Sequence, residues 1–409
     1  MVDDAVLLAW VDGRSDEILE FARDLIRCPS VNPPGDERAV AELVTSRLLA
    51  LGIDDVRTLA EVEERPNLIA RIHGQGAGPV LILSGHLDTK PPGDQSAWRT
   101  DPWDPVIDGE RMVGLGSGDM KAAVAGMVYA AAALKAAGGF GGELQLVFTA
   151  DEEAGSTRGS RWLAAEGHLR ADAAIIGEPS GITEEWEAIH LISRGAMLLK
   201  VLVTGTQMHS SVSDRFRPIN ATVKMARLID RMDRELKGSL TYAGHPLGGL
   251  GPTVNVGVMA SAGVFYGIYP GNAEFACDIR TLPGMTRAQV EADLRAFLAR
   301  AMDEDPDLHA ELVVEAWVEA TEIKPDEPIV QALLAAAPGA LGSTPRLDAF
   351  PGATDAPHFQ LVAGIPTVAA FGPGILPRAH SPNEWLDRSG PWRAAGVYAL
   401  AAARFLVPG

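Results

Sequence analysis

The stretch LQLVFTADEEAG, from Leu144 to Gly155, decides the fold class of this chain. Its first half is rich in apolar β-formers, which predicts a strand buried on both faces of a sheet. The strand leads directly into Asp151, Glu152 and Glu153. Ligands of open α/β sheets gather outside the carboxyl ends of the strands, so the acidic cluster can mark a cation site. Taken alone, a solvated turn that caps the next helix explains the cluster better.

Two more buried-looking strands end in polar residues. The strand from Val80 to Ser84 leads into Gly85-His86-Leu87-Asp88, and His86 and Asp88 share one side of an extended chain. That spacing suits a metal-binding imidazole whose other ring nitrogen is held by a carboxylate. The third strand, Ala173 to Gly177, leads into Glu178. Three such strand ends favour a site over three unrelated turns.

Two further segments add candidate ligands. The glycine-rich GLGSGDMK, residues 114–121, opens a small-residue helix, and its Asp119 is either a helix N-cap or a metal ligand held by a tight turn. The segment does not satisfy the dinucleotide pattern G-x-G-x-x-G. A last strand, from Pro366 to Phe371, is followed by His380, with Glu384 placed to orient it.

The candidates share imidazole and carboxylate chemistry without thiolate, which suits zinc, cobalt or manganese in a catalytic role. Two histidines and three acids are enough for two metals if one carboxylate bridges them. A carboxylate that is not a ligand must then move the proton of the attacking water. Adjacent residues on extended backbone point in opposite directions, so Glu152 and Glu153 can divide these roles. The predicted metal set is His86, Asp119, Glu153, Glu178 and His380, with Glu152 beside it.

Composition narrows the class of protein. The chain has 409 residues, 47% hydrophobic content and a formal charge of −19, which argues against nucleic-acid and anionic-membrane binding. Cys28 and Cys277 are too few for a disulfide framework or a thiolate zinc site. The N-terminus is acidic where a secretory signal is basic, and the longest apolar run, Ala122 to Leu134, is too short to span a bilayer. A cytoplasmic protein is expected.

The order of elements predicts two domains. The β-α-β-β-α-β order beyond about Ile192, with helices near 218–236 and 286–303, predicts an α+β sandwich with the helices on one face. After about Glu319 the chain again has the apolar runs of buried elements that characterise its first part. We therefore expect a discontinuous α/β catalytic domain, 1–191 and 319–409, with a mixed, mostly parallel sheet flanked by helices. An inserted α+β lid and dimerisation domain is expected at 192–318.

The motifs SGHLDT, GSGDMK, TADEEAGS, IIGEPSG and AHSPNEW, in this order, resemble those of the M20 metallopeptidase family. This family includes acetylornithine deacetylase, succinyl-diaminopimelate desuccinylase, aminoacylases and carboxypeptidase G. The resemblance covers nearly the whole chain, from SVNPPGDE to the C-terminal helix. It implies a pair of divalent metals, expected to be zinc, with cobalt or manganese as alternatives.

The resemblance also assigns roles to the candidates. It implies that Asp119 bridges the metals, that His86 and Glu178 hold one of them, and that Glu153 and His380 hold the other. Asp88 would orient His86, and Glu152 would be the general acid and base. The resemblance further implies a cis peptide bond after Asp119.

The inserted domain carries its own matches. VTGTQMHSS resembles the family segment whose histidine reaches the substrate carbonyl oxygen from the partner subunit, which makes His209 a catalytic candidate; a surface-loop histidine is the alternative. Arg280 would bind a substrate carboxylate or form a structural salt bridge. The remaining substrate-binding candidates are Asn255, Gly352 and Thr354. A homodimer through the lid is implied.

Several positions depart from the family pattern. Gly267 stands where an Asn is usual, Ser261-Ala262-Gly263 replaces a Gly-Gly, and the nearby VFYGIY is unusually aromatic. Ala353 stands where relatives acting on carboxylate-bearing substrates often have Thr, and Leu115 replaces a common Arg. These departures leave the predicted metal set untouched and bear on the substrate.

The sequence therefore predicts a dimetal amidohydrolase that cleaves the amide C–N bond of a small, anionic, N-acyl amino acid-like substrate. Glu178 favours this reading, because relatives resembling aminopeptidases and dipeptidases tend to carry Asp there. A dipeptidase or carboxypeptidase of the same family is one alternative, and hydrolytic deamination of an aromatic amine is another. A metal- or ligand-binding relative without catalysis is the non-enzyme alternative.

Overall fold

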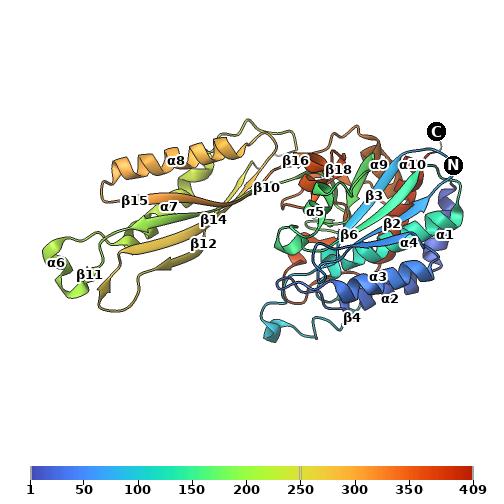
Figure 1. Cartoon of the computed structure of the whole chain (residues 1–409), viewed down its shortest axis with the longest axis horizontal. Coiled ribbons are helices and arrows are strands. Elements are labelled where there is room, and N and C mark those ends of the chain that lie inside the picture. Colours follow the sequence, from blue (N-terminus) through green and yellow to red (C-terminus); the bar gives the residue numbers. More distant parts are fainter. Residues whose placement is uncertain (1, 248, 250, 408–409) are drawn as a thin grey trace. The chain divides into compact units, whose positions relative to one another are not determined.

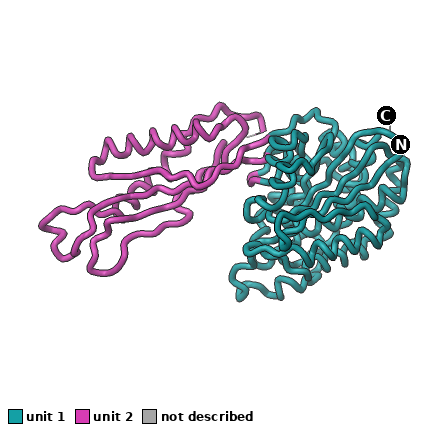
Figure 2. The backbone as a smooth tube through the Cα atoms, in the orientation of Figure 1, with its two compact units in different colours: residues 1–192, 322–350, 354–409 teal, residues 193–321, 351–353 magenta. Residues whose placement is uncertain are grey.

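The computed structural model describes residues 2–247, 249 and 251–407, and the chain divides into two compact units (Figure 2). Unit 1 comprises residues 1–192, 322–350 and 354–409, and unit 2 comprises residues 193–321 and 351–353. The sequence predicts an insertion at 192–318, and the short segment 351–353 also groups with unit 2. Each unit has its own sheet and its own buried apolar residues.

A six-stranded mixed sheet forms the centre of unit 1, in the order β1-β2-β6-β3-β7-β18 (Figure 1). The pairs β1–β2 and β2–β6 are antiparallel, whereas β6–β3, β3–β7 and β7–β18 are parallel. The predicted α/β class with a mostly parallel sheet is confirmed. The strands are β1 (Val56–Leu59), β2 (Asn67–His73), β3 (Val80–His86), β6 (Glu143–Thr149), β7 (Ala173–Ile176) and β18 (Thr367–Val368).

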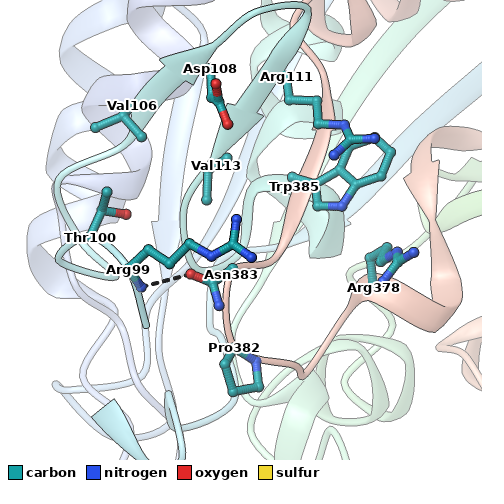
Figure 3. Close-up of a pocket in the computed structure, with 10 residues that line it drawn as sticks. All are labelled: Arg99, Thr100, Val106, Asp108, Arg111, Val113, Arg378, Pro382, Asn383 and Trp385. Carbon is teal, nitrogen blue, oxygen red and sulfur yellow. Dashed lines mark hydrogen bonds between the residues drawn. The ribbon is translucent and has the colours of Figure 1, made fainter. Parts of the chain in front are cut away.

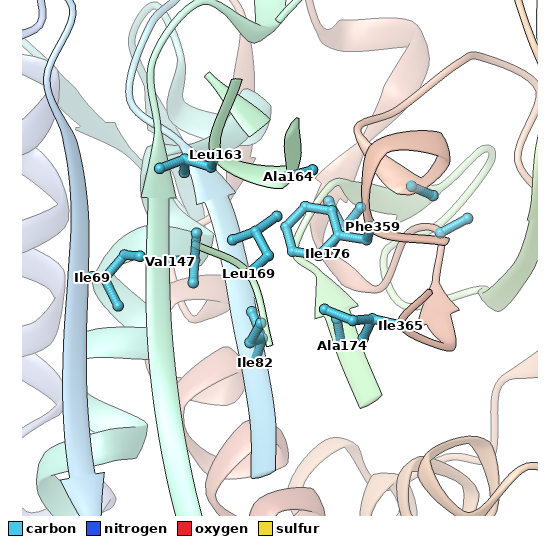
Figure 4. Packing of buried hydrophobic residues seen from close by; sticks show 12 residues of the cluster. Ile69, Ile82, Val147, Leu163, Ala164, Leu169, Ala174, Ile176, Phe359 and Ile365 are labelled. Carbon is cyan, nitrogen blue, oxygen red and sulfur yellow. The ribbon is translucent and has the colours of Figure 1, made fainter. Parts of the chain in front are cut away.

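Both faces of this sheet are covered. On one face, strand residues such as Ile82, Val147 and Ile176 pack against Leu163 of α5 and against Phe359 (Figure 4). Alternate strand residues point to the opposite face, where α4 packs. The helices of unit 1 are α1 (Asp4–Asp12), α2 (Ser15–Ile26), α3 (Arg38–Ala50), α4 (Ala122–Ala137), α5 (Ser160–Ala165), α9 (Pro328–Leu341) and α10 (Gly390–Phe405).

Helix α4 is the central helix of unit 1, and every residue from Ala122 to Leu134 is buried. Its small side chains permit close packing: a Cβ added at Gly126 would lie 2.6 Å from Cβ of Ala394 in α10. The helical stretch Ser117–Ala137 is longer than the apolar run noted in the sequence, and by length and composition it could cross a membrane. However, 83% of its apolar window is buried inside the structure, as in a core helix.

Short strands complete unit 1 and shape the loops around the main sheet. A parallel pair joins β8 to β19, and a three-stranded sheet has the order β20-β5-β4. Another three-stranded sheet has the order β16-β9-β17. The strands of these sheets are β4 (Val106–Asp108), β5 (Arg111–Val113), β8 (Pro179–Gly181), β9 (Ala188–Ser193), β16 (Thr321–Glu322), β17 (Arg346–Ala349), β19 (Gly372–Ile375) and β20 (Trp385–Asp387).

Unit 2 contains an antiparallel four-stranded sheet in the order β12-β14-β10-β15. With its helices it follows the predicted β-α-β-β-α-β order. A separate two-stranded antiparallel sheet joins β11 to β13. The elements are β10 (Gly195–Thr204), β11 (Met208–His209), α6 (Ser213–Phe216), α7 (Ala221–Ser239), β12 (Thr253–Ala262), β13 (Ile268–Tyr269), β14 (Asn272–Thr281), α8 (Arg287–Glu304) and β15 (His309–Val318).

Candidate metal centre

The carboxyl ends of β3, β6 and β7 lie at one edge of the main sheet. The register aligns Gly85 with Phe148 and Ser84 with Ile176, so the residues that follow each strand emerge side by side. His86 ends β3, the acidic cluster follows β6, and Glu178 follows β7. The parallel pairing predicted from apolar runs therefore gathers these side chains.

Asp119 lies on the turn that precedes α4. Gly116 has a φ of +75°, which favours glycine, and the Asp119–Met120 peptide bond is cis, as the resemblance implied. The backbone N–H groups of Gly118 and Asp119 donate to Oε1 of Glu384 at 2.8 and 3.2 Å, and that of Gly116 donates to Oε2 at 3.2 Å. The buried Glu384 therefore fixes the Asp119 turn, whereas the sequence predicted that it orients His380.

Asp119 lies between the two histidines. Its Oδ1 is 2.9 Å from Nε2 of His86, and its Oδ2 is 3.1 Å from Nε2 of His380. Glu178 lies 3.6 Å from the same nitrogen of His86, and Glu153 lies 3.1 Å from that of His380. The five predicted ligands thus converge, with one carboxylate shared between two groups.

Alternative groupings of the same residues meet the geometry of a metal site. Ligand atoms of His86, Glu152 and Glu178 lie within 4.8 Å of one another, as do those of His86, Asp119 and Glu153. Glu152 therefore lies within reach of the predicted ligands. The division of ligands between two metals stays a prediction.

Asp88 supports the site differently from the prediction. Its backbone carbonyl, at 2.9 Å from Nδ1 of His86, is the nearer partner, and its carboxylate lies 3.6 Å away. A proton on Nδ1 would leave Nε2 free as a ligand atom. The Asp88 carboxylate instead accepts from Asn32 at 2.8 Å and from the backbone N–H groups of Glu152 and Glu153 at 3.2 and 3.1 Å. Asp88 therefore positions the two glutamates.

The sequence predicted extended backbone at the acidic cluster, but the structure shows a turn there. Asp151 has a φ of 66°, and Glu152–Ala154 forms a 3-10 turn, so the two glutamates are separated by a turn and not by strand alternation. Asp151 accepts from Nη2 of the buried Arg65 at 2.8 Å and from Oγ1 of Thr157 at 2.8 Å. Nothing near Arg65 in the sequence indicated this ion pair, because its partner lies 86 positions away.

Burial and like charge shape the protonation of the cluster. Burial raises the pKa of Glu152 well above its usual range, and nearby carboxylates add to this effect. Burial, followed by the charge of Asp119, does the same to the pKa of Glu178. Burial opposes ionisation of Asp119 too, but hydrogen bonds from His380 and His86 hold its pKa well below normal. Four carboxylates around two imidazoles form a donor set that fits divalent cations.

Lys90 is a neighbour of the cluster that was not among the residues predicted from the sequence. Its ammonium group lies 3.3 Å from Oε2 of Glu153 and also contacts the main-chain oxygen of that residue. Its position directly after the SGHLDT motif was the available signal.

The remaining predicted residues are described within their own units. The guanidinium of Arg280 faces the Asp278 carboxylate, with Nε 2.8 Å from Oδ1 and Nη2 2.8 Å from Oδ2, which is the salt-bridge alternative. Nδ1 of His209 lies 2.9 Å from Oγ of Ser211. Asn255 pairs with Asp278 across β12 and β14, and the Gly352 carbonyl accepts from the N–H of Arg194. In unit 1, Oγ1 of Thr354 accepts from the N–H of Ala356 at 3.2 Å. Their roles in substrate binding stay predictions.

Curated relatives match much of the chain. Succinyl-diaminopimelate desuccinylase of Stenotrophomonas maltophilia is 34% identical over 289 residues, covering 69% of this chain and 72% of the relative. The enzyme of the same name from Gluconacetobacter diazotrophicus is 31% identical over 366 residues, covering 88% and 89%.

Solved structures share the fold. An M20 metallo-carboxypeptidase from Sulfolobus solfataricus aligns with a TM-score of 0.76 at 20% identity, covering 96% of this chain and 100% of that one. A dinuclear metal-binding M20 peptidase from Bacillus subtilis aligns with a TM-score of 0.66 at 17% identity, covering 97% and 99%. Residues 82–404 match Peptidase family M20/M25/M40. The chain is therefore a metallohydrolase of the M20 peptidase family.

Proposed function

We propose that this enzyme is a dimetal amidohydrolase that removes the acyl group from a small N-acyl amino acid. The observation that carries the proposal is the position of Asp119 between His86 and His380, with Glu152 close to the same ligand atoms. His86, Asp119, Glu153, Glu178 and His380 would hold two divalent cations, of which zinc is the expected metal. When bound, such a pair polarises the scissile carbonyl and activates water near neutral pH.

The chain's own residues then supply proton transfer and positioning. Glu152 takes the proton of the attacking water and returns it to the departing amine, which makes it the general base and then the general acid. Asp88 holds Glu152 in place through its backbone N–H. His209 would donate to the substrate carbonyl oxygen, where negative charge develops during attack.

The names of the relatives favour deacylation of an anionic substrate. Both relatives described above are named as succinyl-diaminopimelate desuccinylases, and 34% and 31% identity connect them to this chain. The proposed recognition of a substrate carboxylate by Arg280 is supported less well. The guanidinium of Arg280 already faces Asp278, so a substrate carboxylate would have to compete for it.

A second candidate is hydrolysis of a substrate with an aromatic group, including deamination of an aromatic amine. The pairing of β11 with β13 sets His209 opposite Ile268. The loop between β12 and β13 carries Phe265 and Tyr266, which are 74% and 93% exposed. The loop with these rings leads into the strand that pairs with the segment bearing the proposed catalytic histidine. A dipeptidase is the further alternative, and it would require a free α-amino group.

The proposal also includes an assembly and a location for the enzyme. We place the enzyme in the cytoplasm as a homodimer formed through unit 2. Strand β12 lies at one edge of its sheet, with Val258 and Met259 exposed, and an edge strand can pair with another chain. Light scattering after size-exclusion chromatography measures the mass in solution, and a monomer would exclude the dimer.

A substrate panel tests the proposed reaction. Zinc-, cobalt- and manganese-loaded enzyme is incubated with N-succinyl and N-acetyl amino acids, dipeptides, and aromatic amides and amines, with released amine and ammonia both measured. Turnover of N-acyl amino acids alone is expected. Activity restricted to dipeptides with a free amine would replace the proposal by the dipeptidase. Ammonia release from aromatic amines would replace it by the deaminase. No turnover with any metal would favour a binding protein.

A further inference from the structure

A cationic cavity of about 400 Å³ lies in unit 1 and contains none of the six residues of the candidate metal centre (Figure 3). Its wall is formed by the segment after Trp98, by the β4–β5 hairpin and by the loop that ends in β20. The charged side chains that line it are Arg99, Arg111, Arg378 and Asp108. Cavities of this volume accept small-molecule ligands.

In the part of the chain that the structure describes, none of the three arginines forms an ion pair with a carboxylate. Within the described residues, no carboxylate oxygen lies within 4.0 Å of a guanidinium nitrogen of Arg99, Arg111 or Arg378. By contrast, the nearby Arg388 is paired with Glu110 at 3.2 Å. A cavity with three guanidinium groups and one carboxylate is unusual on a chain whose formal charge is −19. It would attract anions.

Trp385 holds two of the arginines in place. The guanidinium carbon of Arg111 lies 4.0 Å from the centroid of the indole ring, and that of Arg378 lies 5.8 Å from it. Such cation–π contacts order a guanidinium without neutralising its charge or occupying its fork of donors. The donors therefore remain available to a ligand.

Asn383 ties two walls of the cavity together. Its Oδ1 accepts from the backbone N–H of Arg99 at 2.7 Å, and its Nδ2 donates to the carbonyl of Ala97 at 2.9 Å. The segment around Arg99 is thus fixed to the loop that carries Arg378. Figure 3 shows Arg99, Arg111 and Arg378 around the same space.

We propose that this cavity binds a small anion with two or more negative charges, held by Arg99, Arg111 and Arg378. Guanidinium groups match carboxylate and phosphate oxygens with paired hydrogen bonds, and three of them favour a multiply charged ligand over a single carboxylate. The proposal concerns a second site and goes beyond the proposed reaction.

The cavity is connected to the metal centre through one short loop. Between Arg378 and Trp385 the chain carries His380, which reaches Asp119 and Glu153, and Glu384, which fixes the Asp119 turn. An anion that bridges Arg378 to Arg99 or Arg111 would hold this loop in place. The bound anion therefore slows the loss of metal from the site that includes His380.

Calorimetric titration of the metal-loaded full chain tests the site, with sulfate and tricarballylate as multiply charged probes and acetate as the singly charged comparison. Arg111→Gln and Arg378→Gln are each expected to weaken binding of tricarballylate by roughly tenfold or more. Arg99→Gln should act in the same direction without touching Trp385. Arg388→Gln, which removes a paired arginine, is the matched control and should leave affinity within about twofold.

The outcomes separate this cavity from other anion sites. Absence of binding, or binding that survives all three cavity substitutions, would overturn the proposal; survival would place the anion at the metals instead. Equal affinity for acetate would overturn the requirement for multiple charges. Metal loss to a chelator is followed with and without tricarballylate. Slower loss in the parent but not in Arg378→Gln supports the connection to His380, and an unchanged rate overturns that connection.

Discussion

The ammonium nitrogen of Lys90 lies 3.3 Å from Oε2 of Glu153, and the backbone N–H of Lys90 donates to Oε1 of the same carboxylate at 3.2 Å. Glu153 is buried, whereas the Lys90 side chain is about one-third exposed. A fixed cation therefore shares a carboxylate that we assign to a metal. Like charges repel at such range, so we expect Lys90 to lower the affinity for a cation at the proposed Glu153 and His380 ligands.

Replacement of Lys90 by Met is expected to tighten one of the two metal-binding steps, that of the cation proposed at Glu153, by about tenfold, because the substitution removes this repulsion. Competition with a fluorescent chelator measures both binding steps. Lys90→Arg keeps the charge and should stay close to the parent. Weaker binding by Lys90→Met would show that the lysine serves mainly to orient Glu153.

Glu384→Ala is expected to lower both stability and metal affinity. The carboxylate accepts from three backbone N–H groups on the Asp119 turn, and its removal leaves those donors buried without a partner. Unpaired buried donors cost about 1–3 kcal/mol each, partly offset where water enters. Denaturant unfolding and metal content measure the two effects. Glu384→Gln retains an acceptor oxygen and should be the milder change. If both variants unfold and bind metal as the parent does, Glu384 does not fix the Asp119 turn.

The strand ends could be predicted because their information is local. Apolar runs identify buried strands, and parallel pairing then brings His86, Asp151 and Glu178 to one edge. The predicted role of Glu384 was wrong because the information that decides it is not local. The sequence offered His380 as a neighbour, but the partners of Glu384 lie 265 to 268 positions away. Local spacing cannot reveal such contacts.

Local backbone conformation limited the prediction in a second way. The assumption of extended backbone at Glu152 and Glu153 failed because Asp151 adopts a positive φ and a 3-10 turn follows. Asp88 was placed near His86 correctly, but its carboxylate turns toward the backbone of those glutamates. Residue identity at the site was therefore easier to predict than the hydrogen bonds that aim each side chain.

Glu152→Gln should abolish turnover while leaving metal binding intact. Glutamine has nearly the same shape but cannot take up the proton of the attacking water, and loss of a general base typically costs about 10²–10⁴-fold in rate. Steady-state kinetics on the best substrate of the panel measure the loss of turnover, and elemental analysis measures the metal content. Full activity would exclude Glu152 as the base. Loss of metal would instead assign it to the ligands.

Glu185 makes the stability of unit 1 depend on pH. Burial raises its pKa from 4.5 to about 7, although the N–H of Asp387 donates to it. Because the folded pKa lies above the unfolded one, its contribution to stability is complete below pH 4.5 and is lost as pH rises to about 7. Between pH 5 and 8 this loss amounts to about 2 kcal/mol.

Glu185→Gln cannot ionise. The difference in free energy of unfolding, Glu185→Gln minus parent, should therefore increase by about that amount between pH 5 and pH 8. Urea unfolding of both proteins at pH 5 and pH 8 measures the change, and Glu166→Gln, on an exposed residue at the end of α5, is the control. A constant difference between Glu185→Gln and the parent would mean that Glu185 is already ionised in the fold at pH 5.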